Sequence, residues 1–529
     1  MTPMTSTLGD MIRARAAEGP DRPAITYEGV TITYAELDAR ASRVASGLLD
    51  IGIRPGDRIA FLDKNGPAYF ELLLGAAKAG IVTVAVNWRL APREMAFVIR
   101  DATARVLVVG SEFTPMLPEI LRDASDVEKV LAIGDPERPD PERPDHESFD
   151  AWGARQRPTD PMVPTSVDDV AMQVYTSGTT GLPKGAMLPH RNLFALAPYF
   201  SDELGFGPDS VSLVVMPVFH VAGAGWGLVG LFNGAHNVLH RDVDLGLILD
   251  AIPRYRVTHT LFVPAVMQLL LATPGVEDTD FSSLRAVVYG ASPISRELLA
   301  RVIERFGCEF TQAYGLTETT GAVVMLPAAD HDPDGPHPER LRAAGVAMPG
   351  VELRIADPAT GAERAPETVG EVWIRSAQVM VGYWHQPEET ARAVDADGWF
   401  RSGDAGYLDA HGYLFISDRV KDMVITGGEN VYPAEVEHVL MEHPDVADVA
   451  VIGVPDERWG ETVKAVVVRR AGSAMTESDL IAFARERLAA YKCPTSVDWA
   501  DVLPRNPSGK ILKRDLRAPY WRDQDRGVH

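Results

Sequence analysis

The sequence predicts an α/β fold for most of the chain, followed by a small α+β unit near the C-terminus. Between about residues 165 and 330, short apolar runs alternate with helical patterns, as in parallel βαβ units. The pattern changes near residue 418, beyond which two helices and two strands form a small self-sufficient group. We therefore expect a large N-terminal domain with parallel βαβ-type sheets packed with helices plus a β-rich portion, and a small mobile α+β domain after it.

The clearest βαβ unit runs from a strand at Arg285–Tyr289, through a helix, to a strand at Glu309–Gln312. Ser295 is a suitable N-cap for the helix, and Gly307 stands where a C-terminal cap belongs. One face of the helix is apolar; it consists of Leu298, Leu299, Val302, Ile303 and Phe306. This spacing predicts two parallel strands joined by a right-handed crossover.

Further elements are expected on both sides of this unit. In the large domain they are strands at Val211–Met216 and Thr258–Val263, a hairpin at Ala24–Tyr34, a helix at Tyr34–Leu49 and a solvated loop at Asp135–Asp150. In the small domain they are helices at Pro433–Glu442 and Thr476–Ala490 and strands at Val446–Val454 and Thr462–Arg469. We expect the large domain to span residues 1–417, a hinge 418–422, and the small domain 423–529.

Charge and cysteine content exclude several classes of protein. The net charge of −23 opposes binding to nucleic acid or to anionic lipid, so a polyanionic ligand needs local positive groups. The two cysteines, Cys308 and Cys493, are too few for a disulfide framework, which favours a reducing cytoplasm. No apolar run approaches the roughly 20 residues that cross a bilayer. A cytoplasmic protein without integral membrane association is expected; the sequence leaves homodimer formation open.

The segment Thr176–Gly185 has the composition of a phosphate-binding loop. Glycines let backbone N–H groups turn inward, four Ser/Thr hydroxyls add donors, and Lys184 adds a mobile positive charge. It is not a Walker A loop, because Pro183 stands where that motif has glycine and no Ser/Thr follows Lys184. Taken alone, the segment is also compatible with a flexible Gly/Thr surface loop.

Three other segments carry candidate nucleotide-binding groups. Gln312–Glu318 follows a predicted strand, at the edge where open α/β sheets bind ligands. Phe400–Asp404 offers a carboxylate suited to ribose hydroxyls, and Pro504–Ile511 places Lys510 on a Pro/Gly-shaped turn. Each segment alone is compatible with an ordinary strand end or turn, so their value lies in occurring together and in this order.

Together these segments resemble those of the adenylate-forming superfamily, which contains acyl-CoA synthetases, amino-acid adenylation domains and firefly luciferase. The resemblance runs from about residue 30 to Lys513 and includes Pro217–His220, residues 418–430 and Tyr432–Glu437. It implies an enzyme that uses ATP, Mg²⁺ and coenzyme A to activate a small-molecule carboxylic acid through an acyl-adenylate.

The resemblance also implies a role for each matching residue. Tyr314 would stack on adenine, Thr317 would touch the α-phosphate, and Lys510 would bridge the carboxylate and the α-phosphate. Asp404 and Arg419 would hold the ribose, while Glu318 and Thr176 would bind Mg²⁺. The implied catalytic residues are Lys510, Lys184, Glu318, Thr317 and His220. The implied ATP/AMP site consists of Thr176, Ser177, Gly178, Thr179, Thr180, Gly181, Lys184, Gly290, Ala291, Gln312, Ala313, Tyr314, Gly315, Thr317, Asp404, Arg419 and Lys510.

Small residues after His220 indicate the class of acid. Amino-acid adenylation domains usually carry an aspartate in this region, whereas this chain does not, so an α-amino acid is disfavoured. The expected acyl pocket consists of Phe219, His220, Val221, Ala222, Gly223, Ala224, Gly290, Gly315 and Leu316. A medium to long fatty acid or another bulky hydrophobic acid is favoured, with an arylalkenoic acid such as a cinnamate as the alternative. Ala224 stands where some long-chain members have a gating tryptophan, and Trp226 lies two residues further on.

In the second half-reaction Lys510 and the incoming thiol would need overlapping space, and the resemblance implies that the small domain rotates between two orientations to provide it. The resemblance assigns the pivot to Lys421, and a short charged linker without glycine can serve as one. After rotation, Gly427, Gly428, Glu429 and Asn430 would line a tunnel for the pantetheine arm of CoA. A carrier protein in place of CoA and a luciferase-like oxygenase remain alternatives.

Three other motifs match known sites imperfectly. Gly225–Gly230 satisfies G-x-G-x-x-G, but the acidic residue of a dinucleotide-binding unit has no clear counterpart about 20 positions on. Residues 330–341 begin like an EF-hand loop but have Leu341 where the bidentate glutamate belongs. His331, His337 and Glu339 are a weak metal-ligand candidate, so this region is interpreted as a Pro-rich acidic loop.

Overall fold

The computed structural model describes residues 6–134, 147–176, 183–292, 294–419, 422–426, 429–456, 459–505 and 510–522. Contacts divide the chain into two compact units. Unit 1 contains Met1–Glu352 and Arg375–Phe400, and unit 2 contains Leu353–Ile374 and Arg401–His529. This division does not follow the expected borders at residues 417 and 423. The hinge itself stays a prediction, because Val420 and Lys421 lie outside the described residues.

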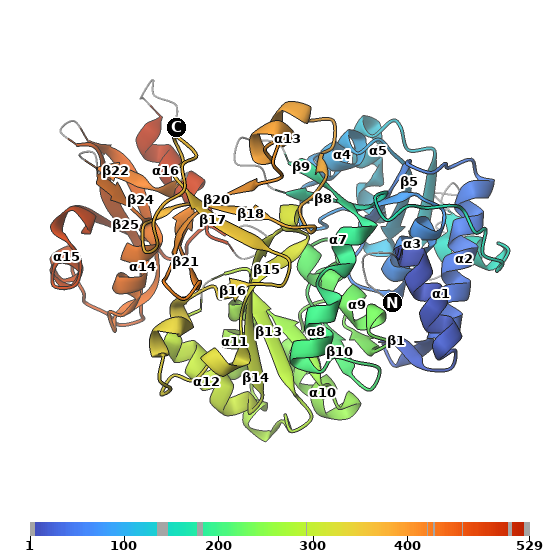
Figure 1. The fold of residues 1–529 in the computed structure, drawn as a ribbon, viewed down its shortest axis with the longest axis horizontal. Coiled ribbons are helices and arrows are strands. Elements are labelled where there is room, and N and C mark those ends of the chain that lie inside the picture. Colours follow the sequence, from blue (N-terminus) through green and yellow to red (C-terminus); the bar gives the residue numbers. More distant parts are fainter. Residues whose placement is uncertain are drawn as a thin grey trace. The chain divides into compact units, whose positions relative to one another are not determined.

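Two large sheets form the framework of unit 1 (Figure 1). The first has nine strands in the order β16-β15-β14-β13-β12-β10-β11-β1-β2. Its members, in that order, are Val346–Ala347, Gly321–Leu326, Glu309–Leu316, Ala286–Gly290, His259–Phe262, Val211–Val214, His236–Leu239, Pro23–Tyr27 and Val30–Thr33. The strands from β14 to β1 pair in parallel, and the outer strands pair antiparallel.

The second sheet has eight strands in the order β19-β9-β8-β4-β3-β5-β6-β7. These are Gly382–Tyr383, Lys184–Pro189, Val170–Thr176, Val82–Ala85, Arg58–Leu62, Ala104–Gly110, Lys129–Ile133 and Glu147–Ser148. The strands from β8 to β7 are parallel, whereas β9 pairs antiparallel with both β8 and β19. Parallel sheets of the βαβ type are thereby confirmed.

Helices cover the faces of both sheets. In unit 1 they are α1 (Leu8–Glu18), α2 (Tyr34–Asp50), α3 (Pro67–Lys78), α4 (Pro92–Asp101), α5 (Leu117–Asp123), α6 (Phe149–Ala154), α7 (His190–Phe194), α8 (Ala197–Leu204), α9 (Val221–Phe232), α10 (Leu245–Tyr255), α11 (Pro264–Leu271), α12 (Arg296–Phe306) and α13 (Pro387–Ala393). Residues of α10, α11 and α12 form one buried apolar cluster with β12, β13 and β14, which lie beside them in Figure 1. Among the described residues, no helix is both long and apolar enough to cross a membrane.

The structure confirms the predicted crossover unit. The Ser295 hydroxyl accepts a hydrogen bond from the N–H of Leu298 at 3.2 Å, which caps α12 at its N-terminus. Gly307 ends the helix at φ 63°, a left-handed conformation that disfavours residues with a side chain. Strands β13 and β14 pair in parallel on either side of the helix in sequence. The carboxyl ends of both strands therefore meet at one edge of the sheet.

One predicted loop is partly wrong. Residues 135–146 lie outside the described residues, but Glu147–Ser148 forms β7 and α6 begins at Phe149. The side chains of Phe149 and Trp152 are both 2% exposed, so their burial gives this segment the regular structure that its polar composition does not predict.

Unit 2 contains two smaller sheets. One has the strand order β17-β18-β20-β21, with strands at Glu352–Ala356, Gly370–Arg375, Phe400–Leu408 and Leu414–Arg419. The other has the order β23-β22-β25-β24, with β26 also on β25; its strands are Glu429–Val431, Val424–Thr426, Gly460–Arg469, Val446–Asp456 and Ser496–Trp499. The helices are α14 (Pro433–Met441), α15 (Glu477–Arg485) and α16 (Lys513–Trp521). The predicted α+β pattern is confirmed.

Helix α15 is shorter than the expected Thr476–Ala490. It ends at Arg485, although Leu488 still packs against the apolar core of this unit. Residues Ala490–Lys492 form a 3₁₀ turn instead, and Pro494 follows shortly after. Because a proline disfavours helical conformation in the residue before it, the chain turns away here toward β26.

Candidate active site

The residues expected to bind Mg²⁺ lie together in unit 1. Thr176 is the last residue of β8, and Glu318 lies in the short turn that follows β14. The Thr176 hydroxyl donates a hydrogen bond to Oε1 of Glu318 at 3.3 Å. The phenol of Tyr383 donates to the same oxygen at 2.9 Å, and the backbone N–H of Met380 donates to the Glu318 carbonyl at 2.8 Å. Side chains from two separate strands, β8 and β19, thus hold one oxygen of the Glu318 carboxylate.

Lys184 belongs to the same cluster. It begins β9 and is the register partner of Thr176. Its ammonium forms an ion pair with Glu389 of α13 and lies 5.3 Å from the centroid of the Tyr383 ring. The hydrogen bond from Lys184 is the main reason that the pKa of Glu389 lies below its ordinary value. Burial and the neighbouring Glu318 carboxylate raise the pKa of Tyr383, which stays protonated.

The oxygen atoms of this cluster fit a magnesium ion shared with a substrate. Mg²⁺ prefers hard oxygen ligands, and proteins usually bind it through one or two carboxylates plus waters and phosphates. Glu318 and Thr176 offer one carboxylate and one hydroxyl 3.3 Å apart. Across the described ranges, no group of three or more His, Cys, Asp or Glu side chains is placed to hold a metal by itself. A cation here would therefore need ligand atoms from the substrate.

The ends of β13 and β14 lie very close to their neighbours. A Cβ added to Gly290 would collide with the carbonyl oxygen of Ala313, and one added to Gly315 would collide with that of Gly321. Close backbone packing therefore requires glycine at both positions, and their place in the acyl pocket stays a prediction. Ala291, the next residue after β13, has φ 66°, which is unusual for a residue with a side chain and is often found at ligand sites.

Helix α9 follows His220 and presents one side to a small apolar cavity. The cavity has a volume of about 10 Å³ and is lined by Met172, Leu193, Leu196, Val221, Gly225, Val229 and Thr320. Val221, Gly225 and Val229 are four residues apart and so share one helix face. Gly223 instead packs against the carbonyl oxygens of Met216 and Pro217, and Ala224 is fully buried. The expected acyl pocket included four residues after His220: Val221, Ala222, Gly223 and Ala224. Of these four, Val221 borders this cavity.

The G-x-G-x-x-G pattern in α9 serves helix packing. A Cβ at Gly227 would meet the ring of Phe70, and one at Gly230 would meet the amide of Asn237. His220 stands at the start of the helix, and its ring packs at 4.5 Å from that of Phe219. Leu316 is the last residue of β14. The pattern thus explains close contacts of a buried helix rather than a dinucleotide site.

Asp404 and Lys510 both belong to unit 2. Asp404 lies on β20, is 6% exposed and pairs across the ladder with the backbone of Arg419 on β21. Lys510 is exposed and directly precedes Ile511, which forms a short β-bridge with Arg505. The backbones of Glu429 and Asn430 form β23. Several expected site residues lie outside the described ranges: Ser177, Gly178, Thr179, Thr180, Gly181, Lys421, Gly427 and Gly428.

Comparison with known protein families decides the classification. A family model described as AMP-binding enzyme matches residues 12–384. The chain belongs to this family. A second model, the C-terminal domain of AMP-binding enzymes, matches residues 435–510 and thus ends at the candidate catalytic lysine. The resemblance to the adenylate-forming superfamily is confirmed.

Individual relatives cover nearly the whole chain. A fatty acid–[acyl-carrier-protein] ligase, ScoC, of Streptomyces coeruleorubidus is 41% identical and covers 100% of this chain and 99% of its own. A feruloyl-CoA synthase of an Amycolatopsis species is 40% identical, covering 97% and 99%. The crystal structure of ATP-bound MatB from Rhodopseudomonas palustris matches at TM-score 0.87 and 32% identity, covering 98% of this chain and 99% of that one.

Two members of the cluster, Tyr383 and Glu389, were missed by the sequence analysis. Tyr383 lies on β19, which pairs with β9, and Glu389 lies in the first turn of α13. Pro387 at the start of that helix, followed by two glutamates, marks a helix N-terminus. That signal predicts the helix. It does not predict that Glu389 meets a lysine 205 residues earlier in the chain.

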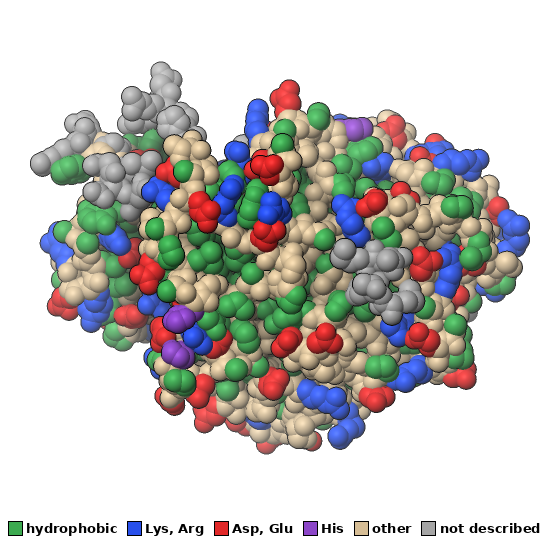
Figure 2. Space-filling model, in the orientation of Figure 1, with side chains coloured by type: hydrophobic (Ala, Val, Ile, Leu, Met, Phe, Trp, Pro, Cys, Tyr) green, Lys and Arg blue, Asp and Glu red, His purple; other side chains and the backbone are tan. Residues whose placement is uncertain are grey.

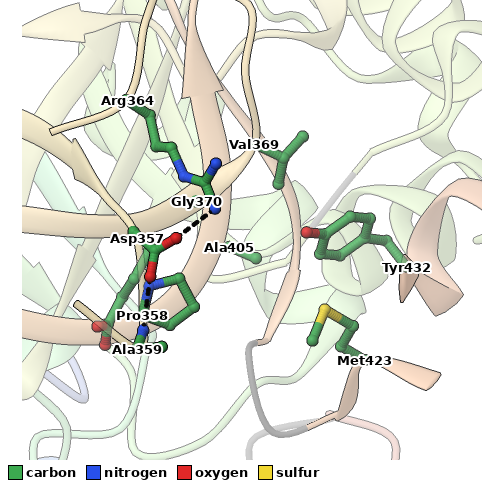
Figure 3. Close-up of a pocket in the computed structure, with 10 residues that line it drawn as sticks. Asp357, Pro358, Ala359, Arg364, Val369, Gly370, Ala405, Met423 and Tyr432 are labelled. Carbon is green, nitrogen blue, oxygen red and sulfur yellow. Dashed lines mark hydrogen bonds and ion pairs between the residues drawn. The ribbon is translucent and has the colours of Figure 1, made fainter. Parts of the chain in front are cut away.

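A separate cavity of about 210 Å³ lies within unit 2 (Figure 3). Asp357 and Arg364 form one side, and Met423 and Tyr432 form the other. The Asp357 carboxylate accepts hydrogen bonds from the N–H groups of Ala359 and Thr360 at 2.9 Å each, and from Arg364 at 2.5 Å. These contacts stabilise the loop that carries Asp357; the second acidic residue of the lining, Glu371, accepts hydrogen bonds from the Trp373 indole and the N–H of Gly403.

The histidine of the acidic loop has a structural role. His331 is 5% exposed, its Nε2 lies 3.0 Å from the Tyr289 hydroxyl, and its Nδ1 lies 2.8 Å from the carbonyl oxygen of Pro327. Burial lowers its pKa to about 4, so the ring is neutral at pH 7. His337 instead is exposed and contacts Glu339 at 3.1 Å. The pair His331 and His337 is therefore not a metal site in the part of the chain that the structure describes.

Proposed function

We propose that the protein is an ATP-dependent acid–CoA ligase that activates a hydrophobic carboxylic acid. The observation that carries this proposal is the cluster of Thr176, Lys184 and Glu318. It brings the ammonium of Lys184, suited to phosphate, to the same strand ends as the hydroxyl of Thr176 and the carboxylate of Glu318, which are oxygen ligands suited to Mg²⁺. Membership of the AMP-binding enzyme family supports the same chemistry.

In the first half-reaction an oxygen of the acid attacks the α-phosphorus of ATP. The new bond joins that oxygen to phosphorus, the bond to the β-phosphate breaks, and pyrophosphate leaves. Two anions approach each other, so cationic groups aimed at the developing charge lower the barrier. Lys184 would hold the outer phosphates, and Lys510 would lie between the carboxylate and the α-phosphate. Mg²⁺ held by Glu318 and Thr176 would neutralise phosphate charge.

In the second half-reaction a thiol of CoA attacks the acyl carbon. The carbon–sulfur bond forms as the thiol loses its proton to solvent, the bond from the acyl carbon to the adenylate oxygen breaks, and AMP leaves with the electron pair. For this step we propose that the small domain turns about Lys421, so that the segment Gly427–Asn430 admits the pantetheine arm. Asp404 and Arg419 would hold the ribose, and Tyr314 the adenine, in both steps.

The proposed acid is a medium to long fatty acid or a similarly bulky hydrophobic acid. The cavity beside α9 is lined by seven residues, none of them ionisable, but its volume of about 10 Å³ holds no more than about one water molecule, so it does not by itself select the acid. One relative is a fatty acid ligase, which supports this choice. Another is a feruloyl-CoA synthase, which keeps an arylalkenoic acid as the second candidate. We place the reaction in the cytoplasm, because the two cysteines are free.

The test is AMP release by the purified protein with a panel of carboxylic acids, measured with CoA, with a carrier protein bearing pantetheine, and with neither. We expect dodecanoate or a cinnamate with CoA to give the highest kcat/KM. Turnover with the carrier protein and none with CoA would mean that the carrier protein, and not CoA, is the acceptor. No acid-dependent AMP or pyrophosphate release under any condition would refute the proposal.

A further inference from the structure

Five residues form a closed ring of contacts on the face of the β8–β9–β19 strands that is opposite to the cluster of Thr176, Lys184 and Glu318. They are Arg58, Asp101, Tyr175, Gln173 and Trp384, and they come from β3, α4, β8 and the residue after β19. All lie in unit 1. None of them was a candidate in the sequence analysis.

The ring can be followed contact by contact. Nε of Arg58 donates to Oε1 of Gln173 at 3.3 Å, and the Gln173 amide donates to the Tyr175 hydroxyl at 3.1 Å. That hydroxyl donates to the Asp101 carboxylate at 2.6 Å. The backbone carbonyl of Asp101 accepts from the indole N–H of Trp384 at 3.0 Å. The Arg58 guanidinium lies 3.3 Å from the centroid of the Trp384 ring, which closes the ring.

The two faces of β8 separate the ring from the reacting groups. Side chains alternate along a strand, so Met172 and Thr176 share one face while Gln173 and Tyr175 share the other. The contacts agree, since Met172 lines the apolar cavity and Thr176 binds Glu318. The register pairs Thr176 with Lys184 and Tyr175 with Gly185. The ring therefore lies directly behind the two residues that begin and end the phosphate-binding segment.

The same alternation extends to β19. Tyr383 pairs with Ala186, so its phenol lies on the side of Lys184 and reaches Glu318. Trp384 follows it, and its backbone N–H donates to the carbonyl of Gly185 at 2.8 Å, while its side chain takes the opposite side. A Cβ at Gly185 would lie 2.6 Å from the Gln173 amide nitrogen, so the ring packs against this backbone without a gap.

The ring members are suited to a rigid support. Gln173 is fully buried and Arg58 is 9% exposed, so the hydrogen bond between them lies away from competing water, while the bonds of Tyr175, Asp101 and Trp384 are partly buried. Burial lowers the pKa of Arg58 to about 10, which leaves the guanidinium charged at neutral pH. Burial and Asp101 raise the pKa of Tyr175, so its hydroxyl keeps the proton that it donates.

We propose that this ring positions Thr176, Lys184 and Tyr383 for ATP, and that its members are positioning residues for adenylation. The proposal rests on the function proposed above, since it assigns ATP to the opposite face of the same strands. The ring touches none of the reacting groups. Its expected effect is on ATP affinity and on the first half-reaction, because a small displacement of positioned groups slows a reaction strongly.

The test uses Tyr175→Phe and Trp384→Phe, each of which removes one donor of the ring and keeps the aromatic ring. Tyr34→Phe is the control, because the Tyr34 hydroxyl also lies in unit 1, is more deeply buried than that of Tyr175, and donates to the carbonyl of Ala235 at 2.7 Å. Three quantities are measured: the ATP dissociation constant by calorimetry, acid-dependent ATP–pyrophosphate exchange, and thioester formation from chemically supplied acyl-adenylate.

Both ring variants are expected to weaken ATP binding and to lower kcat/KM for exchange by about 10-fold or more, with thioester formation from supplied adenylate unchanged. The double variant should be no worse than the stronger single variant, because one break opens the ring. Tyr34→Phe should alter thermal stability without changing either half-reaction. Equal loss in both half-reactions, or unchanged ATP affinity, would overturn the proposal. Absence of acid-dependent ATP–pyrophosphate exchange in the wild-type protein would refute the proposed function. The ATP affinity of the variants would in that case still test whether the ring positions the ATP-binding residues.

Discussion

Lys184 and Glu389 form an ion pair in the structure, and Arg392 contacts the other oxygen of the same carboxylate. The lysine that would receive the outer phosphates of ATP is therefore already bound to an anion. For a phosphate to reach this ammonium, Glu389 must move toward Arg392 or remain as a repelling charge.

Glu389→Gln is expected to lower KM for ATP by about 2- to 5-fold, since a partly exposed ion pair contributes up to about 1 kcal/mol. Steady-state kinetics at saturating acid would show this change. Glu388→Gln is the control, because Glu388 is exposed and lies 3.9 Å from Arg392. A higher KM for ATP in the Glu389 variant would mean that the carboxylate assists binding.

Glu318→Gln should raise the concentration of Mg²⁺ needed for half-maximal exchange by about 10-fold or more and reduce the maximal rate. The amide oxygen keeps the contact with Thr176 and Tyr383 but lacks the charge that attracts a cation. Titration of exchange activity with MgCl₂ measures both effects. Glu352→Gln serves as control, since Glu352 pairs with Arg375 at an exposed site. An unchanged Mg²⁺ requirement would remove Glu318 from the metal site.

Gly225→Leu should shift acid preference toward short chains with little loss of stability. A Cβ at this position meets nothing within 4 Å, and the residue borders the apolar cavity. Ala224→Trp should instead lower Tm, because Ala224 is fully buried and overpacking strains a core. The measurements are kcat/KM for butanoate and dodecanoate, and thermal unfolding. If Gly225→Leu leaves the ratio unchanged, this cavity is not part of the acyl site.

Lys510→Ala should slow adenylation by at least about 10²-fold, as expected for a lost electrostatic group, and leave thioester formation from supplied acyl-adenylate nearly intact.

Lys421→Pro tests the pivot, because proline fixes φ near −65° and restricts the preceding residue. Its expected result is a burst of pyrophosphate near one equivalent with strongly reduced thioester output. Wild-type thioester turnover by the proline variant would exclude residue 421 as the pivot.

Acid should destabilise unit 1 through His190. Its Nδ1 accepts a hydrogen bond from the N–H of Leu8 at 3.2 Å, which requires a neutral ring, and burial lowers its pKa to about 4. A histidine with a lowered folded pKa stabilises the fold above its unfolded pKa of about 6.5, and this stability is lost as pH falls toward 4. His190→Asn keeps an acceptor without titrating. Urea unfolding between pH 6 and 4.5 gives the free energy of unfolding at each pH. Its slope against pH should be smaller in His190→Asn than in the wild type by about 1.4 kcal/mol per pH unit. An unchanged slope would exclude His190.

The sequence predicted those parts of the fold whose stability depends on local patterns. The cap at Ser295, the apolar face of α12 and the left-handed Gly307 all follow from neighbouring residues, and all are confirmed. The helical turn at Phe149 could not be predicted, because its cause is burial of Phe149 and Trp152 against distant parts of the chain.

The same distinction applies to the site. Thr176 and Glu318 were predicted from motifs, and the structure brings them within 3.3 Å. Tyr383 and Glu389 were not, because sheet pairing of β19 with β9 brings them to Lys184. The structure gives Gly223, Gly290 and Gly315 a packing role that the sequence did not predict, since an added Cβ would collide with backbone atoms; their place in the acyl pocket stays a prediction. Steric demands of a distant backbone leave no local signal in a sequence.

The alternation along β8 also affects how this enzyme could change over time. Substitutions at 172 or 176 alter surfaces near the cavity and Glu318, and selection on the acid can act on them directly. Substitutions at 173 or 175 alter the ring behind the strand, where any compensating change must arise in β3, α4 or beside β19. A library intended to diversify substrate preference would therefore sample position 172 of this strand and keep Thr176 and the odd-numbered positions constant.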